Sequence, residues 1–158
     1  MSKILKRSIA AGAVAAVLGA PLTMASFDPR EPLQSYRQAY FTMVAMNFGP
    51  MSDMVRGKMA WDQQAMAGFA EELGAIAELD LLRGFAPGSE KGETRAKPAI
   101  WDNMDDFEAK YADFREAVDG LESAVAGGDR AAIGEAIKNT GGACKACHDE
   151  YKAKNYLY

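Results

Sequence analysis

Both cysteines and the single histidine of this chain lie within residues 144–148, close to the C-terminus. Cys144 and Cys147 are followed directly by His148, which is the C-x-x-C-H spacing of covalent haem attachment. In that chemistry the two thiols form thioethers with the haem vinyl groups, and the imidazole binds the iron. On a helix the three side chains share one face, because residues three and four positions apart are neighbours. The motif therefore predicts one haem c, bound through Cys144 and Cys147, with His148 as the metal ligand.

Other uses of paired cysteines fit this chain less well. A dithiol redox site is expected within a βαβ pattern, and no such pattern surrounds residues 144–148. A structural zinc site needs four ligands, whereas the chain offers two cysteines and one histidine. A disulfide or a pair of buried thiols would not require a histidine at the next position. We therefore interpret the motif as haem attachment.

The N-terminal residues have the pattern of a secretory signal peptide. Lys3, Lys6 and Arg7 precede an uncharged, largely apolar stretch at 8–22, and small residues near Ala25 resemble a cleavage site. The apolar stretch is shorter than the roughly 20 residues that a membrane-spanning helix needs. We predict a signal peptide at 1–25, a periplasmic location, and a mature haem domain at 26–158 with no membrane span. Export agrees with the motif, because bacteria attach haem c outside the cytoplasm.

The charge balance excludes one class of partner. The full chain has a net charge of −4, and removal of a basic signal peptide makes the remaining chain more acidic still. An acidic domain of this kind is not expected to bind nucleic acid. No repeat, charge run or low-complexity stretch indicates a second domain.

Apolar residues recur at helical spacing along most of the mature chain, and no segment alternates with period two. A proline- and glycine-rich stretch at 84–98 is expected to be the only long loop. The predicted helices span 31–48, ended by Gly49 and Pro50; 61–82; 101–125, ended by Gly127 and Gly128; and 129–151, with Asp129 as the N-cap. Together they predict an all-α fold, an antiparallel four-helix bundle with the haem in the core near the C-terminal helix.

Three segments carry a resemblance to a known family. They are the sequence YRQAYF at 36–41, KPAIW at 97–101 and CKACHDEYK at 144–152. In this order they resemble the cytochrome c′ family, and the similarity extends over residues 32–151. The resemblance implies a four-helix bundle that is commonly a homodimer through its first two helices. It also implies an iron that is usually five-coordinate, in proteins that bind NO, in some cases CO, and that are linked to NO tolerance or electron transfer.

The function depends on what faces the iron opposite His148. The resemblance places Phe41 there, and a phenylalanine ring covers the iron but cannot coordinate it. The positions one helical turn from Phe41 hold no methionine, and Met43 and Met46 lie on other faces of that helix. We therefore predict a five-coordinate haem protein that binds NO and CO, and not an enzyme. The alternative is a low-spin, six-coordinate Met/His electron carrier, which requires a methionine from elsewhere, such as the connection at 51–59.

Four further residues are expected to contact the haem. Arg37 and Gln38 are expected to bond a haem propionate, and Tyr151 shares the stripe of the last helix that holds Cys144 and His148. Lys152 matches a basic position of the resembled family, near the side of the ring that His148 occupies. Its alternative role is that of a solvated lysine that stabilises the end of the helix. The sequence specifies no particular redox partner protein.

Overall fold

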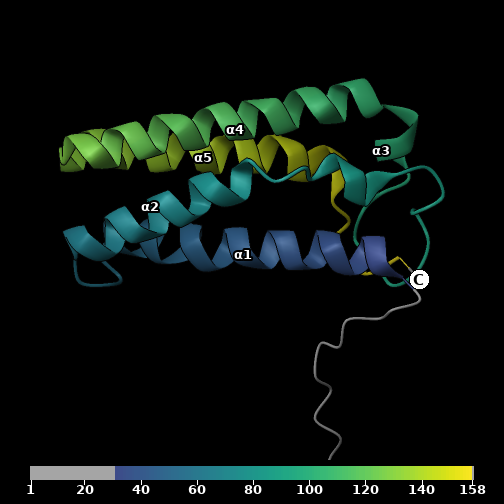
Figure 1. The fold of residues 1–158 in the computed structure, drawn as a ribbon, viewed down its shortest axis with the longest axis horizontal. Coiled ribbons are helices and arrows are strands. Elements are labelled where there is room, and N and C mark those ends of the chain that lie inside the picture. The colour runs from purple at the N-terminus through teal and green to yellow at the C-terminus, as the bar shows by residue number, and fades with distance from the viewer. Residues whose placement is uncertain (1–30, 158) are drawn as a thin grey trace, which may run out of the picture.

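The computed structural model describes residues 31–157, which form a bundle of long helices (Figure 1). Its elements are α1 (Pro32–Val55), α2 (Gln63–Ala77), the 3-10 helix η1 (Leu82–Phe85), the short α3 (Ala99–Asp102), α4 (Met104–Gly127) and α5 (Arg130–Tyr151). The four long helices run alternately in opposite directions, so the predicted all-α, antiparallel four-helix bundle is confirmed. Within the described residues no helix is both long and apolar enough to cross a membrane. The predicted signal peptide at 1–25 lies outside the described residues.

The first helix is longer than predicted. We expected it to end at residue 48, before Gly49 and Pro50, but α1 continues through Pro50 to Val55. Met51 and Met54, in the turn that follows the proline, are 0% and 5% exposed and pack in the hydrophobic core. A proline inside a helix costs about 3 kcal/mol. Full burial of a methionine side chain contributes about 1.5–3 kcal/mol. Two such side chains therefore offset the cost of the proline.

The second helix begins two residues after its predicted start at 61 and ends earlier than predicted. The carboxylate of Asp62 accepts hydrogen bonds from the backbone N–H groups of Gln64 and Ala65, at 2.9 and 3.0 Å, and so caps α2. The helix ends at Ala77, and the predicted end at residue 82 is wrong because the chain there forms η1 instead. Leu79, which follows the end of α2, is 43% exposed.

The second half of the bundle follows local signals closely. The predicted helix at 101–125 is divided into α3 and α4, because Asn103 leaves the helical conformation between them. Gly128 takes the left-handed conformation, with φ +74°, and ends α4 as predicted. Asp129 then caps α5 through the N–H groups of Ala131 and Ala132.

Two hydrophobic clusters fill the bundle. One lies among all four long helices and includes Met51, Met66 and Leu121. The other is rich in aromatic residues, including Tyr40, Phe85 and Phe107, and lies towards the end where α1 begins and α5 finishes (Figure 1). The last helix packs mainly on α4 and much less on α1. This arrangement leaves space between α1 and α5 for a site.

Candidate haem site

A cavity of about 630 Å³ lies between α1, α4 and α5. This volume falls within the roughly 300–1,000 Å³ that is typical of cofactor and small-molecule sites. Cys144, Cys147 and His148 all contribute to its wall from one face of α5. The structure therefore brings the whole attachment motif to one large internal space.

The cavity changes character along its length. Its α1 wall is polar at the end where α1 begins and apolar further along the helix. Because α5 runs opposite to α1, Lys152 lies at the polar end and Cys144 lies further in. A haem has the same polarity, with an apolar ring and two propionate carboxylates on one edge, so the lining fits that group. From α1 the lining residues are Gln34, Arg37 and Gln38, followed by Phe41, Val44, Ala45 and Phe48.

The electrostatic state of the motif suits covalent attachment and iron binding. Burial raises the pKa of the Cys144 thiol, and burial with the nearby Cys144 raises the pKa of the Cys147 thiol to about 11. A thioether carries neither a charge nor an acidic proton, so it suits these half-buried positions. Burial, together with the positive charges of Lys152 and Arg95, lowers the pKa of His148. The imidazole is therefore neutral at pH 7 and can offer a nitrogen lone pair to a metal.

The α1 wall of the cavity is apolar where the sequence predicted it to be. Phe41 lines the cavity and remains 40% exposed, and its ring meets the ring of Tyr40 edge-on, with centroids 5.3 Å apart. Within the part of the chain that the structure describes, no methionine belongs to the cavity wall. Met43 and Met46 are 38% and 68% exposed. The side chains along this wall can cover an iron but cannot coordinate it.

Arg37 lies at the polar end of the cavity and is only 4% exposed. Its guanidinium donates to the carbonyl of Gly84 at 2.6 Å and to the hydroxyl and carbonyl oxygens of Ser89, both at 3.0 Å. It also lies over the Phe85 ring, 5.0 Å from the centroid. A side chain on Gly84 would come within 2.9 Å of Arg37, so glycine permits this close approach. Arg37 thus attaches the segment after α2 to α1, a role that the sequence did not reveal.

Among residues 31–157, no carboxylate forms an ion pair with Arg37. Burial lowers the pKa of its guanidinium. A buried cation is costly unless an anionic or well-oriented polar group compensates it. The predicted propionate contact is compatible with this environment. Gln38 is exposed at the same end, and its amide reaches the Glu93 carbonyl at 3.4 Å.

Comparison with known proteins agrees with this geometry. The family model for cytochrome c′ matches residues 33–152, which include the cavity wall of α1 and the complete attachment motif. The chain belongs to the cytochrome c′ family. The resemblance seen in the three sequence segments is thereby confirmed, and members of this family are haem proteins.

Relatives within the cytochrome c′ family cover most of the chain. The cytochrome c′ of Rubrivivax gelatinosus is 42% identical over 120 residues, which are 75% of this chain and 92% of that protein. The solved cytochrome c prime of Shewanella frigidimarina has a TM-score of 0.76 at 36% identity and covers 82% of this chain and 100% of its own. A nitric oxide complex of a mutant cytochrome c prime from Alcaligenes xylosoxidans has a TM-score of 0.73 at 32% identity, with 82% and 100% coverage.

Tyr151 and Lys152 lie at the C-terminal end of α5 and make different contacts there. Tyr151 is 4% exposed and lines the cavity, and its hydroxyl donates to the carboxylate of Asp106 on α4. This hydrogen bond lowers the pKa of Asp106 and raises the pKa of Tyr151 to about 12. The backbone N–H of Lys152 ends α5 by donating to the carbonyl of His148 at 3.2 Å. Lys152 also lines the cavity, on the side of His148.

The sequence missed a strap that holds the end of α5. We define this strap as the paired segments 94–97 and 152–157. The N–H of Ala153 donates to the carbonyl of Arg95 at 2.8 Å, and the Arg95 side chain returns a 2.8 Å bond to the carbonyl of Ala153. The backbone N–H of Lys97 donates to the carbonyl of Tyr151, and its ammonium group donates to the carbonyl of Glu150 at 2.7 Å. Arg95 thereby reaches the polar end of the cavity, although it lies far from the motif in the sequence.

Proposed function

We propose that this cytochrome c′ family member holds one haem c through Cys144 and Cys147, with His148 as the axial ligand and a sixth iron position that is open to NO and CO. When bound, haem supplies an iron that binds diatomic gases and exchanges one electron. The observation that carries the proposal is the α1 wall, which presents apolar side chains and no methionine among the described residues. An open, dry position suits ligand binding more than a fixed low-spin state.

Each side chain of the cavity has a distinct role in this proposal. His148, neutral at pH 7, would hold the iron through a ring nitrogen, and Phe41 would cover the iron from the α1 wall. Arg37 and Gln38 face the propionate edge at the polar end of the cavity, and Lys152 adds a positive charge on the His148 side. Tyr151 contributes to the buried wall near the end of α5.

The chemistry of the wall also favours particular ligands. The inner α1 positions Phe41, Val44 and Phe48 offer no hydrogen-bond donor to a bound gas. Bound O₂ gains stability from such a donor, whereas NO and CO bind ferrous haem without one. A related cytochrome c prime from Alcaligenes xylosoxidans forms a nitric oxide complex in mutant form. We therefore assign this protein to NO binding and NO tolerance, with electron transfer as a compatible activity, and not to catalysis.

We propose the cellular location and the processing of the chain from its sequence. A signal peptide at 1–25 would direct the chain to the periplasm and leave the haem domain at 26–158. We propose that the mature protein is a homodimer through α1 and α2. The exposed Met43 and Met46 on α1 supply apolar surface for such an interface.

One optical experiment tests the open sixth position. Spectra of the reduced holoprotein are recorded before and after addition of CO, and then of NO. We expect a high-spin spectrum that changes on addition of either gas. A low-spin spectrum that CO leaves unchanged would contradict the proposal and would support the Met/His electron carrier instead.

A further inference from the structure

Tyr111 on α4 separates two hollows of the molecule. On one side its ring lines the haem cavity. On the other it lines an outer hollow of about 340 Å³ between α4 and the chain that follows α2. Since Tyr111 belongs to both walls, one aromatic side chain stands between the haem cavity and this second opening.

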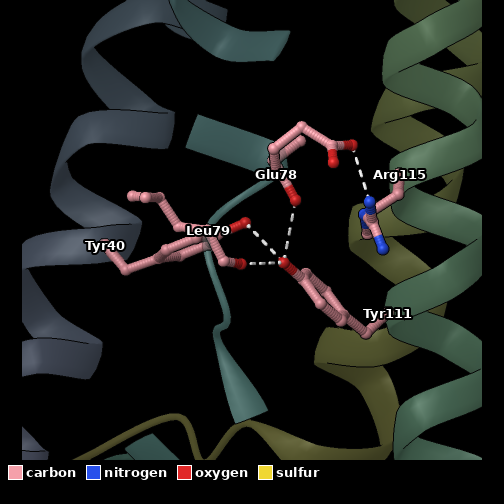
Figure 2. Close-up of polar contacts among 6 residues, drawn as sticks. Tyr40, Glu78, Leu79, Tyr111 and Arg115 are labelled. Atoms are coloured by element: carbon pink, nitrogen blue, oxygen red, sulfur yellow. Dashed lines mark hydrogen bonds and ion pairs between the residues drawn. The ribbon is translucent and has the colours of Figure 1, made fainter. Parts of the chain in front are cut away.

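The Tyr111 ring is held by its hydroxyl group (Figure 2). The hydroxyl oxygen lies 2.8 Å from the carbonyl of Leu79, 3.0 Å from that of Ala77 and 3.3 Å from the hydroxyl of Tyr40. A tyrosine has one hydroxyl hydrogen, which Tyr111 directs to the carbonyls, so Tyr40 must donate to Tyr111. The tether can open without loss of main-chain structure, because the acceptors are carbonyls at the end of α2 where α-helical pairing stops.

The lining of the outer hollow carries more negative than positive charge. Its lining contains the carboxylates of Glu78, Asp80 and Glu108 and one cation, Arg115. Arg115 forms a 2.6 Å ion pair with Glu78 (Figure 2). It therefore does not neutralise the carboxylates of Asp80 and Glu108. Such a lining repels anions such as nitrite but does not oppose an uncharged diatomic gas.

We propose that Tyr111 is the gate of a second entry route, through which small neutral gases pass from the outer hollow into the haem cavity. The inference rests on the proposed gas binding and adds a path to it. The route reaches the cavity from α4 and is independent of the polar end, where the propionate edge is expected. When the Tyr111 hydroxyl exchanges its partners for water, the ring can turn and join the two hollows.

The first test fills the outer hollow without touching the haem cavity. Ala112 lines this hollow and is exposed, whereas Ala109 is an exposed alanine of the same helix that lines neither hollow. We expect Ala112→Trp to lower the CO association rate of the reduced holoprotein, measured after flash photolysis, and Ala109→Trp to leave it unchanged. Equal rates for the two variants would overturn the route.

The second test opens the gate. Tyr111→Phe removes the tether but keeps the ring, and we expect it to raise the CO association rate several-fold; Tyr111→Ala should raise it further. In the Tyr111→Ala background, Ala112→Trp should cancel most of the gain. Unchanged rates in Tyr111→Phe and Tyr111→Ala would contradict the gate. A reduced native protein that does not bind CO would instead contradict the proposed function, so the two failures are distinguishable.

Discussion

At the scale of single residues, the proposed open iron position depends on Phe41. It lines the cavity on α1, and the neighbouring methionines of that helix are exposed to solvent. In the proposal, this one side chain separates a gas-binding haem from an electron carrier. A thioether at this position would have the reach and the lone pair to bind iron.

We predict that Phe41→Met converts the reduced protein from high-spin to low-spin and abolishes rapid CO binding, because the new sulfur occupies the sixth position. The optical spectrum and a CO titration measure this. The control is Met46→Leu, which changes an exposed position and should leave both measurements as in the native protein. A Phe41→Met protein that stays high-spin would show that Phe41 does not face the iron.

Arg37 illustrates a buried charge with a structural role. Its guanidinium satisfies two carbonyls, of Gly84 and Ser89, far along the chain. We predict that Arg37→Met destabilises the holoprotein by about 1–3 kcal/mol, because the change leaves buried acceptors without donors. Denaturant unfolding followed by the haem absorbance measures the loss. Arg83→Met is the control, because Arg83 is exposed and directly precedes Gly84, and an equal loss in both variants would argue against a special role for Arg37.

At the scale of elements, α1 shows tertiary packing overriding a local stop signal. Gly49 and Pro50 are ordinary helix breakers, yet the helix continues because Met51 and Met54 bury their side chains in the core. The resulting extra turns also place Val55 at the far end of the bundle. Removal of that packing should therefore weaken the whole helix.

We predict that Met51→Ala destabilises the protein by about 2–5 kcal/mol, the usual cost of a large-to-small change in a packed core. Met51 is 0% exposed, and the matched control is Met59→Ala, at a position that is 45% exposed shortly after the same helix. The control should change stability by less than about 0.5 kcal/mol. Thermal unfolding of both variants provides the comparison, and similar losses would show that α1 does not depend on this contact.

The strap is a second element-scale feature, since it fastens the end of the helix that carries His148. The ammonium group of Lys97 donates to the carbonyls of Glu150 and Asp149, at 2.7 and 3.3 Å. A cation at a helix C-terminus also interacts favourably with the helix dipole.

We predict that Lys97→Met lowers stability by about 0.5–1.5 kcal/mol, through loss of these bonds. Hydrogen exchange should also quicken at the amides of Lys152 and Ala153. Lys138→Met is the control, because Lys138 only forms an exposed pair with Glu135. Unaltered exchange at the end of α5 would show that Lys97 does not hold it.

At the scale of the whole molecule, the cavity makes the fold dependent on its cofactor. Its wall is largely apolar, and without haem these side chains would face water or lose their packing partners, both of which are unfavourable. The bundle without haem should therefore not keep its native packing.

We predict that the double variant Cys144→Ala, Cys147→Ala, purified without haem, retains helical far-UV circular dichroism but loses its near-UV signal and its cooperative thermal transition. The comparison is the native holoprotein at the same concentration. A haem-free chain with a sharp transition and native near-UV signal would show that the four helices pack without the cofactor.

Signals that act between neighbouring residues could be interpreted from the sequence. The spacing of Cys144, Cys147 and His148 predicted the site chemistry, and Asp129 and Gly128 predicted the junction of the last two helices, because attachment motifs and helix caps span only a few positions. The apolar spacing predicted the bundle, and Phe41 lines the cavity.

Only the tertiary structure decided the remaining features. These features join residues that are distant in the chain. They are the continuation of α1 past Pro50, the hydrogen bonds of Arg37 to Gly84 and Ser89, the strap at Lys97, and the position of Tyr111 between two hollows. Local propensity cannot encode such contacts, because their energy comes from burial and hydrogen bonds that exist only after the helices have packed.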